Sequence, residues 1–480
     1  MKYSIYIFLL FAVAISSCKK YLEQVPDNRT QLDSPEKVAQ LLGTAYPQAS
    51  YITFAESISD NVEDKGAGVV LNINLNPFFF QDVQDQQQDS PEFYWNACYT
   101  AIAASNQALA TCMAAPDSQN YRTQKGEALV TRAFSHFMLV NFFSKFYDAT
   151  TAGTDPGIPY VTEPEKVVFK NYDRKTVQYV YDMVEKDLTE GLPLLKDQAY
   201  TVPRYHFNLA AAHAFAARFY LFKKDYDKVI EHASAAFPNN NFADNMRPWN
   251  TTYQTLSFYT LLATYTKATE PANLLLTEMP SNYARNYATF RYGLSYAKQR
   301  DILGANVTGG RWAYSVFYYG AQDYFVPKFN EYFVTTSINA NTGIPYIMQP
   351  ELTTEEVLLS RAEAYIYKNN TAAATADLNT FVSKRILSYS PSQHNITATK
   401  LSNFYGTSDL QTGLLLATLD FRRAEYVMEG LRWFDLQRYK IPVEHLFYDG
   451  STKTLSPTDP YRVFQIPESA TLSGIALNPR

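Results

Sequence analysis

The chain has 480 residues, a formal net charge of −5 and 19% charged residues. This length can bury a large hydrophobic core, in one large domain or in two to four of average size. The sequence has no basic cluster and no zinc-finger spacing, so nothing in it indicates nucleic-acid binding. Aromatic residues make up 15% of the chain, with 38 Tyr against 4 Trp. Tyr suits surfaces that recognise polar ligands, although we expect most of these rings to fill helix contacts.

The first 17 residues have the composition of a secretory signal peptide. Lys2 precedes an apolar run from Ile5 to Ile15, which is too short to span a membrane. Small residues then precede Cys18, a pattern that resembles a bacterial lipobox, where cleavage leaves a lipidated cysteine. We therefore expect a lipid anchor on Cys18 and a polar tether over residues 18–33. The alternative is an ordinary signal peptide with an incidental cysteine.

The other two cysteines fall in one predicted helical region. Cys98 and Cys112 are fourteen residues apart, which corresponds to about 21 Å of rise on a straight helix. That distance is too long for a disulfide, so we expect two buried thiols.

The folded part begins with a short predicted helix over Pro35–Leu42, for which Ser34 is the N-cap. Residues 51–88 are polar and contain two glycines and a glutamine-rich stretch. We expect this segment to be a surface loop that contributes to a binding face.

Helical patterns dominate the rest of the chain and begin at Pro91. Further helices are predicted over residues 122–143, 176–194, 208–222 with a continuation to 236, 354–367 and 372–385. An alanine-rich helix, a tight turn and a second helix are typical of tetratricopeptide-like hairpins. Because the hairpins are far apart in the sequence, we expect a mainly α fold in which they form a scaffold with long irregular insertions.

The largest insertion covers residues 237–350 and shows little periodicity. Long irregular segments on a helical scaffold usually carry function, so we expect the binding face here, with help from residues 51–90. Trp312 is the preferred platform, because the two glycines before it allow an exposed turn and Arg311 can donate to hydroxyl groups. The alternative is that Trp312 lies buried under its own loop. The other candidate ligand-binding residues are Trp249, Tyr283, Tyr292 and Tyr314.

Residues 420–439 read DFRRAEYVMEGLRWFDLQRY, with apolar positions at spacings of three and four. This spacing predicts a helix. Pairs of opposite charge that could form along it are Arg422–Glu425, Glu429–Arg432, Arg432–Asp435 and Asp435–Arg438. On spacing alone, the favoured interpretation is a solvated helix with ordinary ion pairs.

The string Arg422-Arg423-x-Glu425…Glu429-Gly430-x-Arg432-Trp433-x-Asp435-Leu436-x-Arg438 resembles the C-terminal signature of the SusD/RagB family. Other segments that resemble this family are Cys18–Glu23, Gly157–Tyr160 and Phe464–Glu468. The resemblance covers essentially the whole mature chain and implies a single SusD-like domain over residues 34–480. It also implies that residues 420–439 are a buried structural helix. Members of this family are surface lipoproteins that capture nutrients for a TonB-dependent outer-membrane transporter.

Catalytic motifs are missing from the sequence. There is no P-loop, no His-Glu-x-x-His and no Gly-x-Ser-x-Gly, and the six His show no metal-binding spacing. We therefore expect no enzymatic activity, no cofactor and no metal site.

Together with the resemblance, this favours a cell-surface protein that binds an oligosaccharide and delivers it to a SusC-like TonB-dependent transporter. A lipid anchor would hold it on the outer face of the outer membrane. The alternatives are a peptide-binding, RagB-like lipoprotein and a lipid-anchored glycoside hydrolase, since the chain has many carboxylates that could form a catalytic pair.

Overall fold

The computed structural model describes residues 32–167, 170–337 and 340–480. The expected signal peptide, Cys18 and most of the expected tether lie outside the described residues. None of the helices in these three ranges combines the length and apolar character that a membrane crossing needs.

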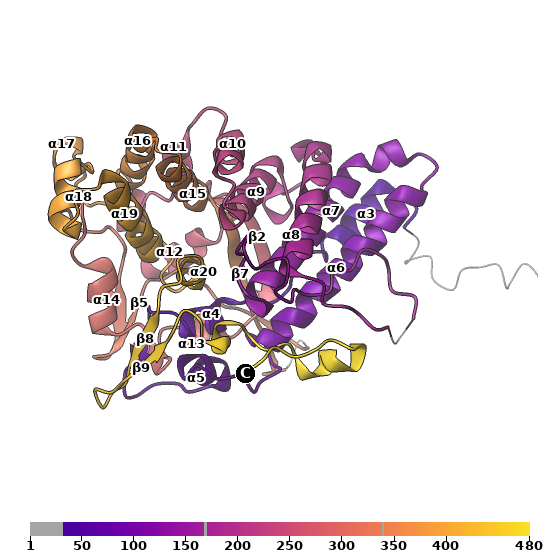
Figure 1. Cartoon of the computed structure of the whole chain (residues 1–480), viewed down its shortest axis with the longest axis horizontal. Helices are drawn as coiled ribbons and strands as arrows, with labels where there is room; N and C mark the ends of the chain where they lie inside the picture. Colours follow the sequence, from indigo (N-terminus) through magenta and orange to yellow (C-terminus); the bar gives the residue numbers. More distant parts are fainter. Residues whose placement is uncertain (1–31, 168–169, 338–339) are drawn as a thin grey trace, which may run out of the picture.

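A row of packed helices forms the scaffold, and it runs along one side of the molecule in Figure 1. These helices are α3 (Pro35–Leu42), α6 (Pro91–Ala114), α7 (Arg122–Phe143), α8 (Val177–Gly191), α9 (Leu209–Lys223), α10 (Tyr226–Ala236), α15 (Thr354–Tyr367), α16 (Thr371–Val382) and α19 (Leu410–Glu425). Successive members pack as antiparallel pairs, of which α6–α7, α9–α10 and α15–α16 are examples. The expected mainly α fold with helical hairpins is therefore confirmed.

Side-chain caps set the starts of these helices. Ser34, Ser90, Thr176, Asn208 and Asp225 each accept a hydrogen bond from the backbone N–H three residues further on. A cap of this kind satisfies an N–H group that the helix itself leaves unpaired.

Two glycines allow α7 and α8 to approach closely. A Cβ at Gly126 would lie 2.8 Å from the carbonyl oxygen of Gly191, and a Cβ at Gly191 would lie 2.8 Å from that of Gly126. Any side chain at either position would push the two helices apart.

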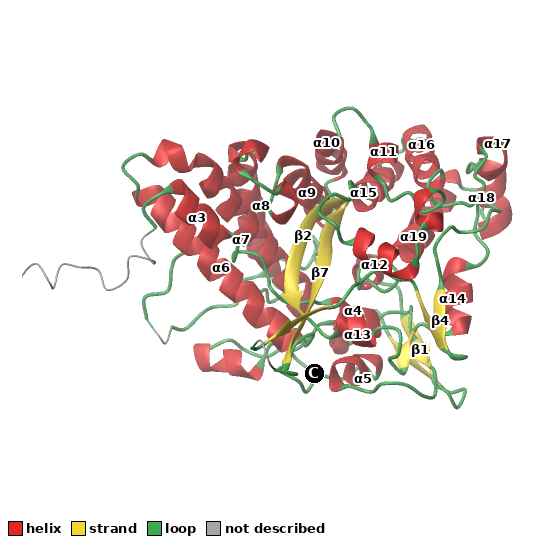
Figure 2. Ribbon diagram, turned by 180° about the vertical axis from the view of Figure 1, so that it is seen from behind, coloured by secondary structure: helices red, strands yellow, loops and turns green. Residues whose placement is uncertain are grey.

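The insertion over residues 237–350 contains strands and short helices. Its strands are β2 (Asn273–Pro280), β3 (Tyr292–Gly293), β4 (Phe317–Tyr319), β5 (Asp323–Phe325), β6 (Tyr332–Thr335) and β7 (Gly343–Thr353). Its α-helices are α11 (Phe242–Asn245), α12 (Phe258–Tyr265), α13 (Tyr283–Asn286) and α14 (Tyr296–Leu303). Strands β2, β7 and β6 form an antiparallel sheet in that order, and Figure 2 shows β2 and β7 beside the scaffold helices.

The remaining elements lie on either side of these segments in the sequence. They are α4 (Ile52–Ser57), β1 (Glu63–Asp64), α5 (Asn72–Phe78), α17 (Pro391–His394), α18 (Ala398–Tyr405), α20 (Arg432–Arg438), β8 (Val443–Leu446) and β9 (Thr452–Leu455). The expectation of a surface loop over residues 51–88 is wrong for residues 52–57, because α4 is buried along its whole length. Glu56 of α4 accepts a hydrogen bond from the Asn61 amide at 3.0 Å. Residues 81–88 are irregular and exposed or half-buried, as expected.

The stretch over residues 420–439 is buried, as expected, but it is not one helix. Helix α19 ends at Glu425 and α20 begins at Arg432, and Met428 and Gly430 between them have φ of 69° and 73°. The carboxylate of Glu56 accepts the N–H groups of these two residues at 2.8 and 3.0 Å and so fixes the turn.

Only one of the four expected ion pairs forms, between Asp435 and Arg438 at 2.9 Å. Arg422 pairs instead with Asp435 at 2.9 Å, across the turn. Glu425 accepts two hydrogen bonds from the guanidinium of Arg385, at 2.5 and 3.0 Å. These charges therefore connect elements that are distant in the sequence.

Cys98 and Cys112 both lie in α6 as buried free thiols, as the sequence predicts. Burial raises the pKa of Cys112 to about 11. The thiol is therefore protonated at neutral pH, and a structural role is consistent with this state.

Candidate ligand-binding surface

The aromatic residues predicted to bind ligand are in the core. Trp312, Trp249, Tyr283, Tyr292 and Tyr314 are all less than 9% exposed, and Trp249 is completely buried. The Tyr314 hydroxyl donates to Glu425 at 2.6 Å, and the Tyr283 hydroxyl donates to the carbonyl of Met428 at 2.8 Å. These five rings are therefore covered by other parts of the protein and are not free to stack on a ligand.

The expectation that Trp312 stands on an exposed turn is wrong. Its backbone forms a β-bridge with Ile386, and its indole packs edge-on against Phe421 at a centroid distance of 5.6 Å. Gly310 allows this approach, because a Cβ there would lie 2.4 Å from the Ile386 side chain. Gly310 thus lets the loop pack closely on the scaffold, while Arg311 remains exposed.

Another part of the same insertion exposes a series of rings. Tyr318 in β4 is 67% exposed and Tyr296 at the start of α14 is 54% exposed, with half-buried Tyr324 of β5 between them. Ring centroids are 5.9 Å apart for Tyr318 and Tyr324 and 5.4 Å apart for Tyr324 and Tyr296. The guanidinium of Arg300 lies 6.0 Å from the Tyr296 ring centroid. We call these four residues the aromatic surface.

The pairing of β4 with β5 determines which rings face outward. Tyr318 is opposite Tyr324, and Phe317 is opposite Phe325. Successive side chains of a strand point to opposite faces. Phe317 and Phe325 pack on Phe258 of α12, with centroids 5.0 and 6.0 Å away, so the two tyrosines are directed to the other face.

An internal ion pair holds this hairpin against the N-terminal part of the fold. The ammonium of Lys65, which follows β1, contacts the carboxylate of Asp323 and donates to the carbonyl of Ala288 at 3.1 Å. Burial lowers the pKa of Lys65, although Asp323 opposes this effect. Tyr448 lies over the next residue, since a Cβ at Gly66 would be 2.4 Å from its ring. Figures 1 and 2 show β1, β4, β5, β8, β9 and α14 at the same end of the molecule.

Tyr296, Tyr318 and Tyr324 are not among the ligand-binding residues predicted from the sequence. A local signal for the hairpin does exist, because residues 317–325 read FYYGAQDYF, with aromatic residues on both sides of a glycine-containing turn. Within the described residues, no group of three or more His, Cys, Asp or Glu side chains is placed to hold a metal ion.

The elements above define a mainly α, tetratricopeptide-like scaffold with a large insertion. Two family profiles match this chain. One, described as starch-binding and associating with the outer membrane, matches residues 20–221, and the other, described as the SusD family, matches residues 236–469. The chain belongs to the SusD/RagB family.

Solved structures have the same fold. A SusD superfamily protein from Bacteroides thetaiotaomicron is 20% identical, with a TM-score of 0.66 over 93% of this chain and 100% of its own. A putative sugar binding protein from Bacteroides vulgatus is 19% identical, with a TM-score of 0.68 over 94% of this chain and 99% of its own. A SusD superfamily protein from Bacteroides fragilis is 17% identical, with a TM-score of 0.67 over 92% and 98%. No curated protein sequence matches the chain.

Proposed function

We propose that this protein is a non-catalytic, lipid-anchored binding protein on the outer face of the outer membrane. It captures an oligosaccharide and delivers it to a SusC-like TonB-dependent transporter. Residues 34–480 act as a single SusD-like domain, and Cys18 carries the anchor.

The aromatic surface is the observation that supports an oligosaccharide as the ligand. Tyr318, Tyr324 and Tyr296 present adjacent rings, and Tyr318 and Tyr296 are more than half exposed. The C–H faces of pyranose rings can stack on such rings, while the phenol hydroxyls and Arg300 can bond to sugar hydroxyls. The match to a starch-binding family profile and the likeness to a putative sugar binding protein support the same class.

A glycan panel tests both parts of this proposal. The purified protein, without its signal peptide, is titrated with soluble oligosaccharides, and the same mixtures are assayed for new reducing ends. We expect binding to at least one glycan and no increase in reducing ends. New reducing ends would instead indicate a glycoside hydrolase, and binding of peptides but of no glycan would indicate the peptide-binding alternative.

Delivery requires a complex with the transporter. Affinity purification of the tagged protein from detergent-solubilised outer membranes should recover a TonB-dependent transporter in comparable amount. Recovery of the protein alone under mild detergent conditions would contradict this part of the proposal.

A further inference from the structure

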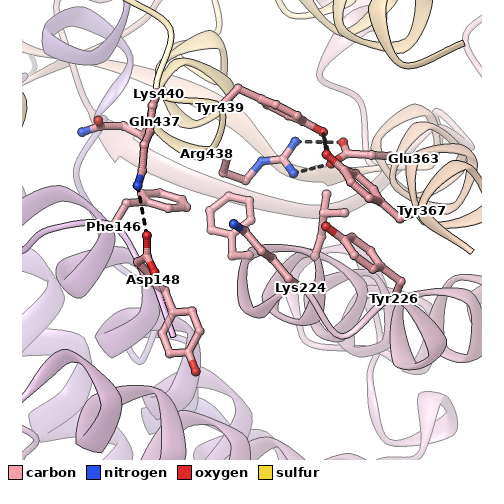
Figure 3. Close-up of a pocket in the computed structure, with 13 residues that line it drawn as sticks. Phe146, Asp148, Lys224, Tyr226, Glu363, Tyr367, Gln437, Arg438, Tyr439 and Lys440 are labelled. Carbon is pink, nitrogen blue, oxygen red and sulfur yellow. Dashed lines mark hydrogen bonds and ion pairs between the residues drawn. The ribbon is translucent and has the colours of Figure 1, made fainter. Parts of the chain in front are cut away.

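A cavity of about 440 Å³ lies between the scaffold helices, on elements that do not carry the aromatic surface (Figure 3). Its walls come from the segment that follows α7, the turn between α9 and α10, the end of α15 and the end of α20. The volume falls in the range of small-molecule pockets. We call this cavity the interhelical pocket.

Two lysines of the pocket occupy the left-handed backbone position that closes a helix. Lys224 follows α9 with φ of 64°, and Lys440 follows α20 with φ of 50°. In each case the next residue donates its N–H to the carbonyl five residues back, at 2.9 Å from Asp225 and 3.0 Å from Ile441. Glycine and asparagine fit this position with the least strain. A lysine therefore gives the backbone no advantage at this position, and we attribute its presence to its charged side chain.

The charges around the pocket do not cancel. Arg438 and Glu363 form a buried bidentate pair with distances of 2.6 and 2.9 Å, and Lys440 lies 3.0 Å from Asp148. Figure 3 shows the ammonium of Lys224 directed into the cavity, and no other described residue of the lining forms a hydrogen bond or ion pair with it. Within the lining, three cationic side chains thus face two carboxylates. Arg438 also pairs with Asp435, which lies outside the lining and is itself paired with Arg422. One positive charge therefore remains available for a ligand.

Aromatic rings with hydroxyl groups complete the walls. Tyr226 and Tyr367 stack in parallel, with centroids 4.4 Å apart and an interplanar angle of 5°. The hydroxyl of Tyr367 lies 3.5 Å from that of Tyr439. The ring of Phe146 gives an apolar wall, and its centroid is 5.0 Å from that of Phe222. Hydroxyl groups, an apolar ring face and an unpaired ammonium suit a hydroxyl-rich ring that carries an anionic group.

We propose that the interhelical pocket binds a single acidic sugar unit, a hexuronate, whose carboxylate lies between Lys224 and Lys440. The sugar hydroxyls bond to the phenol groups of Tyr226 and Tyr367, and the C–H face of the sugar packs on Phe146. Lys224 is exposed, so a neutral sugar gains no ion pair there, whereas the carboxylate of a hexuronate does. This site is separate from the aromatic surface and does not depend on it.

The test is calorimetric titration of the folded protein with methyl β-D-glucuronide, methyl β-D-glucoside and acetate. We expect the glucuronide to bind about tenfold more tightly than the other two compounds, and its affinity to fall as salt is added. Acetate binding as tight as that of the glucuronide would show that any carboxylate is accepted and would overturn the sugar assignment. An absence of glucuronide binding would overturn the proposal as a whole.

Single substitutions test whether the glucuronide binds in the interhelical pocket. Lys224→Asn removes the charge while suiting the left-handed backbone, and it should weaken glucuronide binding about tenfold, whereas Lys224→Arg should retain most of it. Lys368→Asn is the matched control, because Lys368 also closes a helix but pairs with Asp227 at 2.9 Å and is not part of the lining. Equal affinity in wild type and Lys224→Asn would contradict the proposal. Loss of glucuronide binding in Tyr318→Ala would place the sugar on the aromatic surface and would also contradict it.

Discussion

The ammonium of Lys328 lies 2.5 Å from the carboxylate of Glu429, and both side chains are buried. Lys328 also donates to the backbone carbonyls of Glu425 and Val427, at 2.6 and 3.0 Å. One side chain from the insertion therefore satisfies three acceptors in and beside the turn that joins α19 to α20. This turn and the insertion form one packed unit.

Removing one partner of this pair should destabilise the protein strongly. In Glu429→Ala the Lys328 ammonium stays buried without its carboxylate, and Tyr265 loses the acceptor that lies 2.7 Å from its hydroxyl. We expect a loss of about 3–5 kcal/mol in the free energy of unfolding. Chemical denaturation measures this loss.

The control is Glu331→Ala, which breaks the more exposed pair with Arg285 and should cost less than about 1 kcal/mol. Similar losses in the two variants would argue against a structural role for the buried pair. So would unchanged stability in Glu429→Ala combined with lost ligand binding.

Glu351 should make the protein less stable as the pH rises. Burial raises the pKa of Glu351 from 4.5 to about 8, although Arg218 opposes the shift. Between these two values the unfolded chain releases a proton that the folded protein keeps, so the contribution of this group to the free energy of unfolding falls with pH. Glu351→Gln keeps an acceptor for the Gln349 amide, which donates to Glu351 at 3.1 Å.

The variant should therefore gain on the order of a few kcal/mol over wild type near pH 8, and almost nothing near pH 4.5. Denaturation curves at the two pH values give this difference directly. The same pH dependence in both proteins would show that Glu351 ionises normally.

Trp312→Ala tests whether the indole lies in the core and not on an exposed turn. Because Trp312 packs against Tyr314 and Phe421, we expect its truncation to cost about 3–5 kcal/mol of stability. Tyr259→Ala is a suitable control, since Tyr259 is 80% exposed and its loss should change stability by less than about 0.5 kcal/mol. A fully stable Trp312→Ala protein that no longer binds glycan would show instead that Trp312 is part of the binding face.

Cys18 lies outside the described residues, and its lipidation is a prediction from the sequence. Cys18→Ala should move the protein from the membrane fraction to the soluble fraction of cells. Persistence in the outer-membrane fraction after a carbonate wash would contradict a lipid anchor at this residue.

The sequence predicted the scaffold well because its signals are local. The caps Ser34 and Asn208 directly precede the helices that they start, and the alanine-rich face of α9 lies within that helix. The long strand β2 was missed because nearly all of its residues are buried on both faces, so it lacks the alternation that marks a half-exposed strand.

The binding face was harder to predict because the exposure of a ring depends on distant contacts. Trp312 is covered by Ile386 and Phe421, and neither contact can be read from its neighbours in the sequence. Tyr318 faces outward because Phe317 and Phe325 pack on Phe258, which precedes the hairpin by a long stretch of chain. The hairpin itself has a local signal, but the choice among many tyrosines requires the fold.

The central claim is that the aromatic surface binds the oligosaccharide. It is tested most directly by calorimetric titration of a Tyr318→Ala, Tyr324→Ala double variant with the glycan that the wild type binds, beside Tyr259→Ala as a control for a general loss of tyrosine. By analogy with aromatic pairs, we expect each ring contact to contribute about 0.5–1.5 kcal/mol beyond its buried area. We therefore predict an affinity loss of about tenfold or more in the double variant, with an unchanged circular dichroism spectrum and wild-type affinity in the control. Wild-type affinity in the folded double variant would contradict the claim.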